Sequence, residues 1–133
     1  MWIGLDALHT DELDRLLARP WFRAYTYAPE ELALADSFGP ERAREFLAGR
    51  FAGKEAVLKV LRPGAGGRIP PRQVAIVRTG GGAPLVRLSG AAARRAAELE
   101  LAEVSLSISH KGDFVVAAAM ALAEGVEPDL TPP

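Results

Sequence analysis

The sequence contains no cysteine among its 133 residues, which excludes disulfide bonds and thiolate metal sites. A chain without disulfides suits the reducing interior of a cell, so we expect a cytoplasmic protein. The net charge is only −1, and the overall charge therefore gives no reason to expect a nucleic acid as partner. Any electrostatic partner site must be a local patch.

Long hydrophobic runs are also absent. The most apolar stretch, 114–123, is too short to span a bilayer and is interpreted as a fully buried strand. The N-terminus lacks a basic region followed by an apolar core, so neither a signal peptide nor a membrane partner is expected. A chain of this length fits one domain, 1–123, and the segment 124–133, with three prolines, is predicted to be a disordered tail.

The sequence is organised around one long predicted helix, from about residue 40 to 61, in which apolar residues recur at helical spacing. Arg50 and Lys54 fall on the same stripe, where cations are costly unless an anionic group meets them. Gly49 and Gly53 are one turn apart and lack side chains, so a neighbouring backbone or a ligand could approach this helix closely.

The charges on this helix allow two interpretations. Glu55 and Lys59 are one turn apart and could form an ordinary salt bridge on a solvated edge. Alternatively, these two residues join Arg50 and Lys54 in an anion- or metal-binding face. Four charges that flank an apolar stripe with two glycines make the second interpretation competitive.

Shorter elements surround this helix in the prediction. A first strand over 1–5 would deliver Asp6 at its C-terminal end, where an aspartate most often caps the next helix. The segment 63–71 is rich in glycine and proline and is predicted to be a mobile connection. The remaining patterns predict helices over 11–18, 29–36 and 90–99, and strands over 73–78, 84–89, 103–110 and 114–123.

Three separated motifs resemble one enzyme family. The segment 49–56, Gly-Arg-Phe-Ala-Gly-Lys-Glu-Ala, followed by Lys59, closely resembles the signature of the short phosphopantetheinyl transferases, the holo-(acyl-carrier-protein) synthase family. Gly4-Leu5-Asp6 is similar to the family's N-terminal Gly-x-Asp. The segment 107–110, Ser-Ile-Ser-His, is similar to its Ser-x-Ser-His-(Ser/Thr) motif, with Lys111 in place of the hydroxyl residue.

Two weaker matches accompany these motifs. Gly82-Ala83-Pro84 keeps the frame of the Gly-x-Pro turn that lies near the adenine of the cofactor in the family. The segment 27–33 partly matches a family Phe-Thr-x-x-Glu-Leu-Ala pattern, with Ala28 where the threonine would stand. The resemblance covers about residues 3–121. It implies an α+β fold in which an antiparallel sheet packs against a long central helix with shorter helices around it.

The resemblance also implies a reaction. Phosphopantetheine would pass from coenzyme A to a serine of an apo acyl carrier protein, with release of adenosine 3′,5′-bisphosphate, in fatty-acid or polyketide biosynthesis. Asp6 and Glu55 would hold Mg²⁺, which is typically bound by one or two carboxylates plus substrate phosphates. The same two residues and Lys54 would be catalytic, and the proton of the serine could pass to Glu55, to a water or to a second carboxylate. The implied cofactor contacts are Arg50, Lys54, Lys59, Gly82, Pro84, Ser109, His110 and Lys111.

The partners implied by the resemblance are the carrier protein and further copies of the chain. Arg15, Arg19 and Arg23 would dock the acidic helix of the carrier protein, although basic residues late in a helix often only complement its dipole. A chain of one fold unit would form a homotrimer with three interfacial sites.

Two other functions stay open at this point. Departures from the family pattern at Leu58, Ala83, Lys111 and 63–71 would suit a catalytically weak member that binds coenzyme A or a carrier protein. An unrelated α+β scaffold with structural charges is the third hypothesis.

Overall fold

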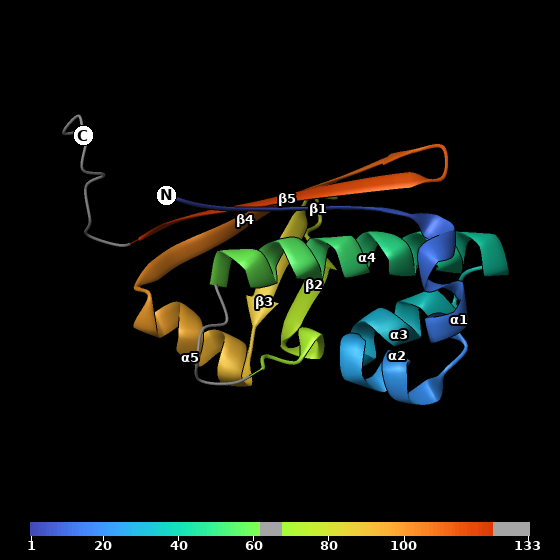
Figure 1. The fold of residues 1–133 in the computed structure, drawn as a ribbon, viewed down its shortest axis with the longest axis horizontal. Coiled ribbons are helices and arrows are strands. Elements are labelled where there is room, and N and C mark those ends of the chain that lie inside the picture. Colours follow the sequence, from blue (N-terminus) through green and yellow to red (C-terminus); the bar gives the residue numbers. More distant parts are fainter. Residues whose placement is uncertain (62–67, 124–133) are drawn as a thin grey trace.

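The computed structural model describes residues 1–61 and 68–123. The predicted tail, 124–133, and most of the predicted mobile connection lie outside the described residues. Figure 1 shows a sheet lying on one side of a long helix, with shorter helices on the other side and a two-stranded hairpin that runs past the long helix up to the sheet. The elements in chain order are β1 (Trp2–His9), η1 (Thr10–Leu13), α1 (Asp14–Leu17), α2 (Pro20–Thr26), α3 (Pro29–Asp36), α4 (Pro40–Leu61), η2 (Pro71–Gln73), β2 (Val74–Arg78), β3 (Pro84–Leu88), α5 (Gly90–Glu98), β4 (Leu101–Lys111) and β5 (Phe114–Ala123).

The main sheet has three antiparallel strands in the order β1-β5-β4, and β2 pairs with β3 in a separate hairpin. All three strands of the main sheet contact α4. Small side chains make this contact close, because Ala48, Ala52 and Ala56 of α4 and Ala117 of β5 are all 0% exposed. The predicted α+β class, with an antiparallel sheet against a long central helix, is confirmed.

The central helix has the bounds that its sequence predicts. Pro40 occupies the first turn, where its missing N–H removes no helical hydrogen bond, and Glu41 and Lys59 complement the helix dipole at the two ends. The two strands after residue 100 also form the predicted antiparallel hairpin.

Three sequence-based predictions of local structure are wrong. The first strand does not end at residue 5 but continues to His9, because β5 pairs with it along its whole length. The predicted helix over 11–18 is instead a 3₁₀ turn followed by the short α1, and α2 was not predicted. Strand β5 alternates between buried and exposed residues because only one face of the sheet is covered by α4.

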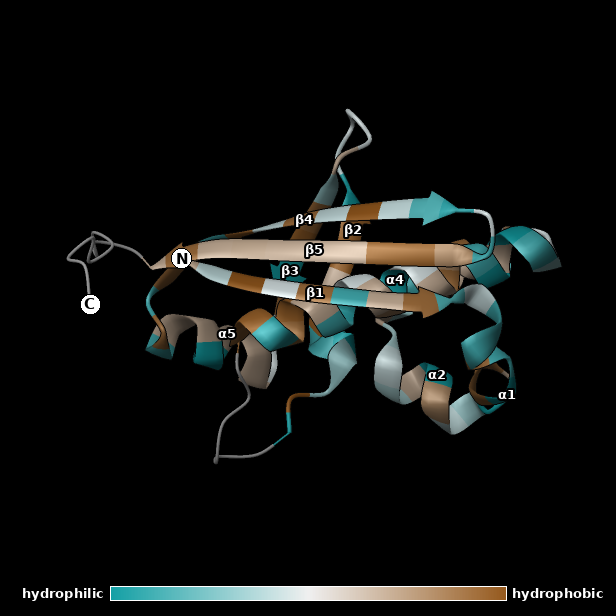
Figure 2. Cartoon of the chain, turned by 45° about the horizontal axis from the view of Figure 1, so that its top comes forward, coloured by the Kyte–Doolittle hydropathy of each residue, from teal (hydrophilic) through white to brown (hydrophobic). Residues whose placement is uncertain are grey.

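The outer face of the main sheet is apolar along β1 and β5. Ile3 and Leu5 of β1 are 64% and 58% exposed, and Met120, the register partner of Ile3, is 46% exposed. Figure 2 shows the apolar β5 in the middle of this face, between β1 and β4. Within residues 1–61 and 68–123, no helix is long and apolar enough to cross a membrane.

Candidate active site

The carboxylate of Asp6 is brought to α4 by a close crossing of β1 over this helix. A Cβ atom added at Gly4 would lie 1.9 Å from the carbonyl oxygen of Ala56, so only glycine allows the strand to lie this near. Asp6 follows on the same face of the strand, two residues later. Lys59 donates hydrogen bonds from Nζ to the carbonyl oxygen of Leu5 at 2.6 Å and to Oδ1 of Asp6 at 3.3 Å.

Glu55 is near enough to Asp6 for the charges of the two carboxylates to interact. Burial raises the pKa of Glu55, the negative charge of Asp6 raises it further, and Lys59 acts in the opposite direction. The two carboxylates therefore share a site that carries more negative than positive charge. Such a pair suits an oxygen-preferring cation that takes its other ligands from water and phosphate, so the residues fit Mg²⁺. Among the described residues there is no cluster of three or more potential metal ligands.

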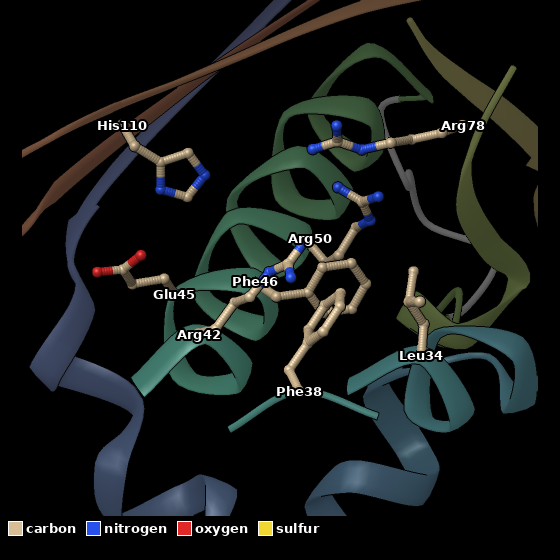
Figure 3. Close-up of a pocket in the computed structure, with 8 residues that line it drawn as sticks. All are labelled: Leu34, Phe38, Arg42, Glu45, Phe46, Arg50, Arg78 and His110. Atoms are coloured by element: carbon tan, nitrogen blue, oxygen red, sulfur yellow. The ribbon is translucent and has the colours of Figure 1, made fainter. Parts of the chain in front are cut away.

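A second functional cluster lies at the opposite edge of the sheet. A cavity of about 370 Å³ opens between α3, α4, β2 and the end of β4. Figure 3 shows the side chains of three arginines directed toward this hollow, with His110 and Glu45 across it. The lining residues are Leu34, Phe38, Arg42, Glu45, Phe46, Arg50, Arg78 and His110. We call this cavity the arginine pocket.

Arg50 is the least exposed cation of the arginine pocket. It is 5% exposed, and its Nε atom is buried and has no hydrogen-bond partner among the described residues. Burial lowers the pKa of Arg50, the carboxylate of Glu31 opposes this shift, and the positive charge of Arg78 lowers the pKa further. A largely buried guanidinium, whose Nε has no hydrogen-bond partner within the described residues and which lies near another cation, indicates a site for an anion.

Aromatic rings support two of the arginines. The guanidinium carbon of Arg50 lies 4.5 Å from the ring centre of Phe46, and that of Arg42 lies 4.0 Å from the ring centre of Phe38. Phe38 and Phe46 contact each other edge to face. The pocket thus combines positive charge with an aromatic wall, which suits a phosphorylated ligand that has an apolar or aromatic part.

The third motif reaches the pocket only in part. His110 faces α4, where a Cβ atom on Gly49 would lie 2.8 Å from its Nε2 atom. Gly49 therefore makes room for the imidazole, which agrees with the predicted close approach to this helix. Ser109 and Lys111 alternate with His110 along β4 and so face the outer side of the sheet. In one copy of the chain, the three predicted cofactor contacts do not lie together.

Lys54 lies in the protein interior, and its predicted catalytic and cofactor-binding roles stay predictions. It is 0% exposed, and its Nζ atom donates hydrogen bonds to Glu31 at 2.5 Å and to the carbonyl oxygens of Val74 and Pro71 at 2.6 and 3.3 Å. The anion that the buried cation requires is therefore Glu31, and not the adjacent Glu55. The ammonium group lies neither among the pocket-lining residues nor at the carboxylate pair.

The other predicted contacts lie on the surface. Gly82 and Pro84 are at the tip of the β2–β3 hairpin, where Gly82 has a φ of 84° that favours glycine. Arg15 and Arg19 are exposed, whereas Arg23 forms an ion pair with Asp36 at 3.4 Å. Their roles stay predictions.

Sequence reasoning missed most of the arginine pocket. Arg42 and Phe46 precede Arg50 by two turns and one turn of α4, so their helical spacing was a usable signal. Arg78 comes from β2 and joins the pocket only through the tertiary fold. Glu31 stood in the partly matched segment 27–33, but no role was assigned to it.

Comparison with known proteins gives a consistent result. The profile of the 4′-phosphopantetheinyl transferase superfamily matches residues 3–119. The holo-[acyl-carrier-protein] synthase of Anaeromyxobacter dehalogenans is 38% identical over 131 residues, which cover 95% of this chain and 97% of that protein. The corresponding protein of Geobacillus kaustophilus is 39% identical over 116 residues, which cover 86% of this chain and 83% of that protein.

Solved structures agree in fold. The holo-[acyl-carrier-protein] synthase of Neisseria meningitidis has a TM-score of 0.77 and 30% identity, over 91% of this chain and 97% of that one. The synthase–coenzyme A complex of Chronobacterium ammoniagenes has a TM-score of 0.78 and 25% identity, over 92% of this chain and 97% of that one. The chain therefore belongs to the 4′-phosphopantetheinyl transferase superfamily and is a phosphopantetheinyl transferase of the holo-(acyl-carrier-protein) synthase type.

Proposed function

We propose that the protein transfers 4′-phosphopantetheine from coenzyme A to a serine hydroxyl of an apo acyl carrier protein. The serine oxygen forms a bond to the phosphorus that bears the pantetheine group, and the bond from this phosphorus to the bridging pyrophosphate oxygen breaks. Adenosine 3′,5′-bisphosphate leaves, and the serine proton passes to a base. The observation that carries the proposal is the Asp6–Glu55 carboxylate pair, which is assembled by the glycine crossing in a member of this family.

In this proposal the protein acts in the cytoplasm. Asp6 and Glu55 would hold Mg²⁺. The ion supplies charge neutralisation for the pyrophosphate oxygens. Lys59 holds Asp6 by a hydrogen bond and presents a second cation beside the carboxylates. The Lys59 side chain is 52% exposed, so we propose that it can also contact an incoming phosphate. Phosphoryl transfer depends mainly on such positioning and charge compensation.

The arginine pocket is the proposed site for further phosphate of coenzyme A. The Nε atom of Arg50 has no hydrogen-bond partner in the part of the chain that the structure describes, so it can donate to a bound anion, and the aromatic wall offers a surface for the apolar parts of the cofactor. Solved complexes of two relatives with coenzyme A support coenzyme A as the ligand of this family, and its placement in the arginine pocket is part of our proposal.

Assembly of the site from more than one copy is also proposed. Asp6 lies on β1 and His110 on β4, the two edge strands of the sheet, with β5 between them. One copy therefore separates the carboxylate pair from the arginine pocket. The exposed apolar outer face, with Ile3, Leu5 and Met120, favours burial against other copies, and we propose a homotrimer.

The proposed docking surface for the carrier protein combines positive charge with exposed aromatic side chains. Arg15 and Arg19 are exposed, and Trp21 and Tyr25 of α2 are 63% and 37% exposed. The guanidinium carbon of Arg72 lies 5.8 Å from the ring centre of Tyr25. This combination complements an acidic amphipathic helix, because arginine and aromatic residues typically dominate the energetics of protein interfaces.

Mass spectrometry of the carrier protein tests the proposal. The protein is incubated with coenzyme A, Mg²⁺ and a panel of apo carrier proteins, and each carrier is weighed. We expect the carrier protein to gain the mass of one phosphopantetheine. This gain should be lost with the enzyme variants Asp6→Ala and Glu55→Gln and retained with the surface control Arg94→Met. Binding of coenzyme A without a mass gain on any carrier would overturn the transferase proposal in favour of a binding module. Equal activity of Glu55→Gln and the wild type would contradict the proposed metal site.

A further inference from the structure

Glu31 and Lys54 form an ion pair in the interior of the protein. The Nζ atom of Lys54 lies 2.5 Å from Oε1 of Glu31, and the two side chains are 0% and 1% exposed. An isolated charge at such a depth would be strongly unfavourable, so each residue depends on the other. The ring centre of Tyr27 lies 5.7 Å from Nζ and covers the pair.

Backbone groups satisfy the rest of this ion pair. Glu31 accepts hydrogen bonds from the backbone N–H of Ala28 at 2.8 Å and of Ile76 at 3.1 Å. Lys54 donates to the carbonyl oxygens of Val74 and Pro71. Two side chains thus connect α3, α4, η2 and β2 through charge-assisted hydrogen bonds, which are stronger than neutral ones.

Three of the elements connected by the ion pair, α3, α4 and β2, line the arginine pocket. Leu34 comes from α3, Arg42 and Arg50 come from α4, and Arg78 comes from β2. The direct contact between Glu31 and the backbone of Ile76 lies two residues before Arg78 on the same strand. The hydrogen bonds of Glu31 and Lys54 to the backbone of β2 therefore help to fix the distance between the β2–β3 hairpin and α4.

The ion pair also opposes the mutual repulsion of the pocket's cations. Arg50 and Arg78 repel each other, and the carboxylate of Glu31 acts on Arg50 in the opposite sense. Without Glu31, the hairpin would lose its hydrogen bond at Ile76, and Arg50 would lose a buried negative charge that offsets its repulsion from Arg78. Both effects favour movement of Arg78 away from α4.

We propose that Glu31 and Lys54 are positioning residues that hold the β2–β3 hairpin against α4 and so align Arg78 with Arg50 for phosphate binding. Lys54 then acts through the geometry of the pocket and not by contact with the reacting phosphate. This inference rests on the proposed function for its kinetic consequence, whereas its structural consequence is independent of that function.

Two conservative variants test the proposal. Lys54→Met keeps the aliphatic length but removes the ammonium group, and Glu31→Gln keeps the shape but removes the charge. Each is compared with the wild type by amide hydrogen exchange of 74–78, by calorimetric affinity for adenosine 3′,5′-bisphosphate, and by kcat and KM for coenzyme A. Val60→Ala is the matched control, because Val60 is a 0% exposed residue of the same helix that lies outside the ion pair and the pocket lining.

Both variants should speed exchange in 74–78 and weaken adenosine bisphosphate binding by about ten- to a hundredfold, in the range seen for residues that orient ligand-binding groups. The KM for coenzyme A should rise by a similar factor, with a much smaller change in kcat. Because each variant removes the same contact, the double variant should be little worse than either single one. Val60→Ala should lower the stability of the protein but leave its affinity for adenosine 3′,5′-bisphosphate unchanged.

Other outcomes would overturn the proposal. A fall in kcat of about a hundredfold or more, with nucleotide affinity retained, would make Lys54 a catalytic acid. Unchanged exchange in 74–78 would show that the ion pair does not hold the hairpin, even if activity were lost. If Lys54→Met does not fold, the isosteric Glu31→Gln gives the same three measurements. Failure of the wild type to modify any carrier would refute the proposed function, while the exchange data would still decide whether the ion pair holds the hairpin.

Discussion

Gly4 of β1 lies so close to the carbonyl oxygen of Ala56 on α4 that a Cβ atom added at Gly4 would be only 1.9 Å from this oxygen. The glycine of the N-terminal motif and the helix of the central motif are thereby one structural unit. Asp6 owes its position beside Glu55 to this crossing. The two motifs were found separately in the sequence, and the crossing explains why both are needed.

Gly4→Ala should separate β1 from α4. A backbone oxygen cannot yield as a flexible side chain can, so we expect a loss of about 1–3 kcal/mol of unfolding free energy, typical of overpacking. The stabilisation by Mg²⁺ should fall with it, because Asp6 moves with the strand. Denaturant unfolding with and without Mg²⁺ measures both effects. Gly39→Ala is the control, because a Cβ atom there meets nothing within 4 Å.

Glu55→Gln should stabilise the metal-free protein. The pKa of Glu55 is raised in the folded state by burial and by Asp6, so the ionised carboxylate opposes folding at pH values above this pKa. That cost disappears as the pH falls toward the unfolded-state value of about 4.3, where both states bind the proton. The difference in thermal midpoint between Glu55→Gln and the wild type should therefore be largest near pH 8 and small near pH 4.

The same carboxylate gives a pH dependence of metal binding. Protonation of Glu55 competes with Mg²⁺, so the apparent affinity for Mg²⁺ should decline at a higher pH than for an ordinary glutamate. At a hundredfold excess over its dissociation constant, Mg²⁺ should stabilise the wild type by about 2.7 kcal/mol and Glu55→Gln far less. Equal stabilisation of both proteins by Mg²⁺ would contradict the assignment.

Arg50→Met should weaken coenzyme A binding by about tenfold or more, because the variant removes the guanidinium that we propose binds a phosphate of the cofactor. Protein stability should change little or rise, since the variant also removes an unpaired buried polar atom. Calorimetric titration with coenzyme A measures the affinity, and a thermal scan measures the stability. Arg94→Met, a change at an exposed position on α5, serves as the matched control.

Mixing two impaired variants, at a coenzyme A concentration low enough for Arg50→Met to show little activity, tests the proposed assembly. If each site takes its carboxylates from one copy and its arginine pocket from another, Glu55→Gln and Arg50→Met should complement each other. Random exchange of an equal mixture should restore about a quarter of the wild-type activity. Activity no greater than that of the separate variants, after subunit exchange has been verified by native mass spectrometry, would argue for sites within single copies.

The docking surface predicts a change in carrier recognition. Arg15→Glu with Arg19→Glu should raise the KM for the carrier protein and reduce its dependence on salt, because positively charged contacts to an acidic helix are lost. Trp21→Ala should raise the same KM without changing the salt dependence. The KM for coenzyme A should be the same in all three proteins. An unchanged KM for the carrier would remove this surface from the proposal.

The sequence by itself determined the elements with local signals. Helix α4 has its predicted bounds because proline, charge distribution and apolar spacing all act within the helix. The reaction class was also accessible, since the three motifs consist of short contiguous segments, and the family assignment confirms it. The close approach at Gly49 was also accessible, because a glycine in a helix shows where a neighbour can come close, although the sequence does not show that this neighbour is His110.

Only the tertiary structure decided which distant residues meet. The partner of Lys54 is Glu31, 23 residues earlier, and a helical pattern contains no information about such a contact. Arg78 enters the pocket because β2 packs across α4, and β1 extends to His9 because β5 continues to pair with it. Local patterns determine which residues form helices and strands, but charge pairing and cavities depend on how those elements pack. The carboxylate pair could therefore be predicted from sequence, and its role stays a prediction, whereas the arginine pocket and the ion pair beside it required the fold.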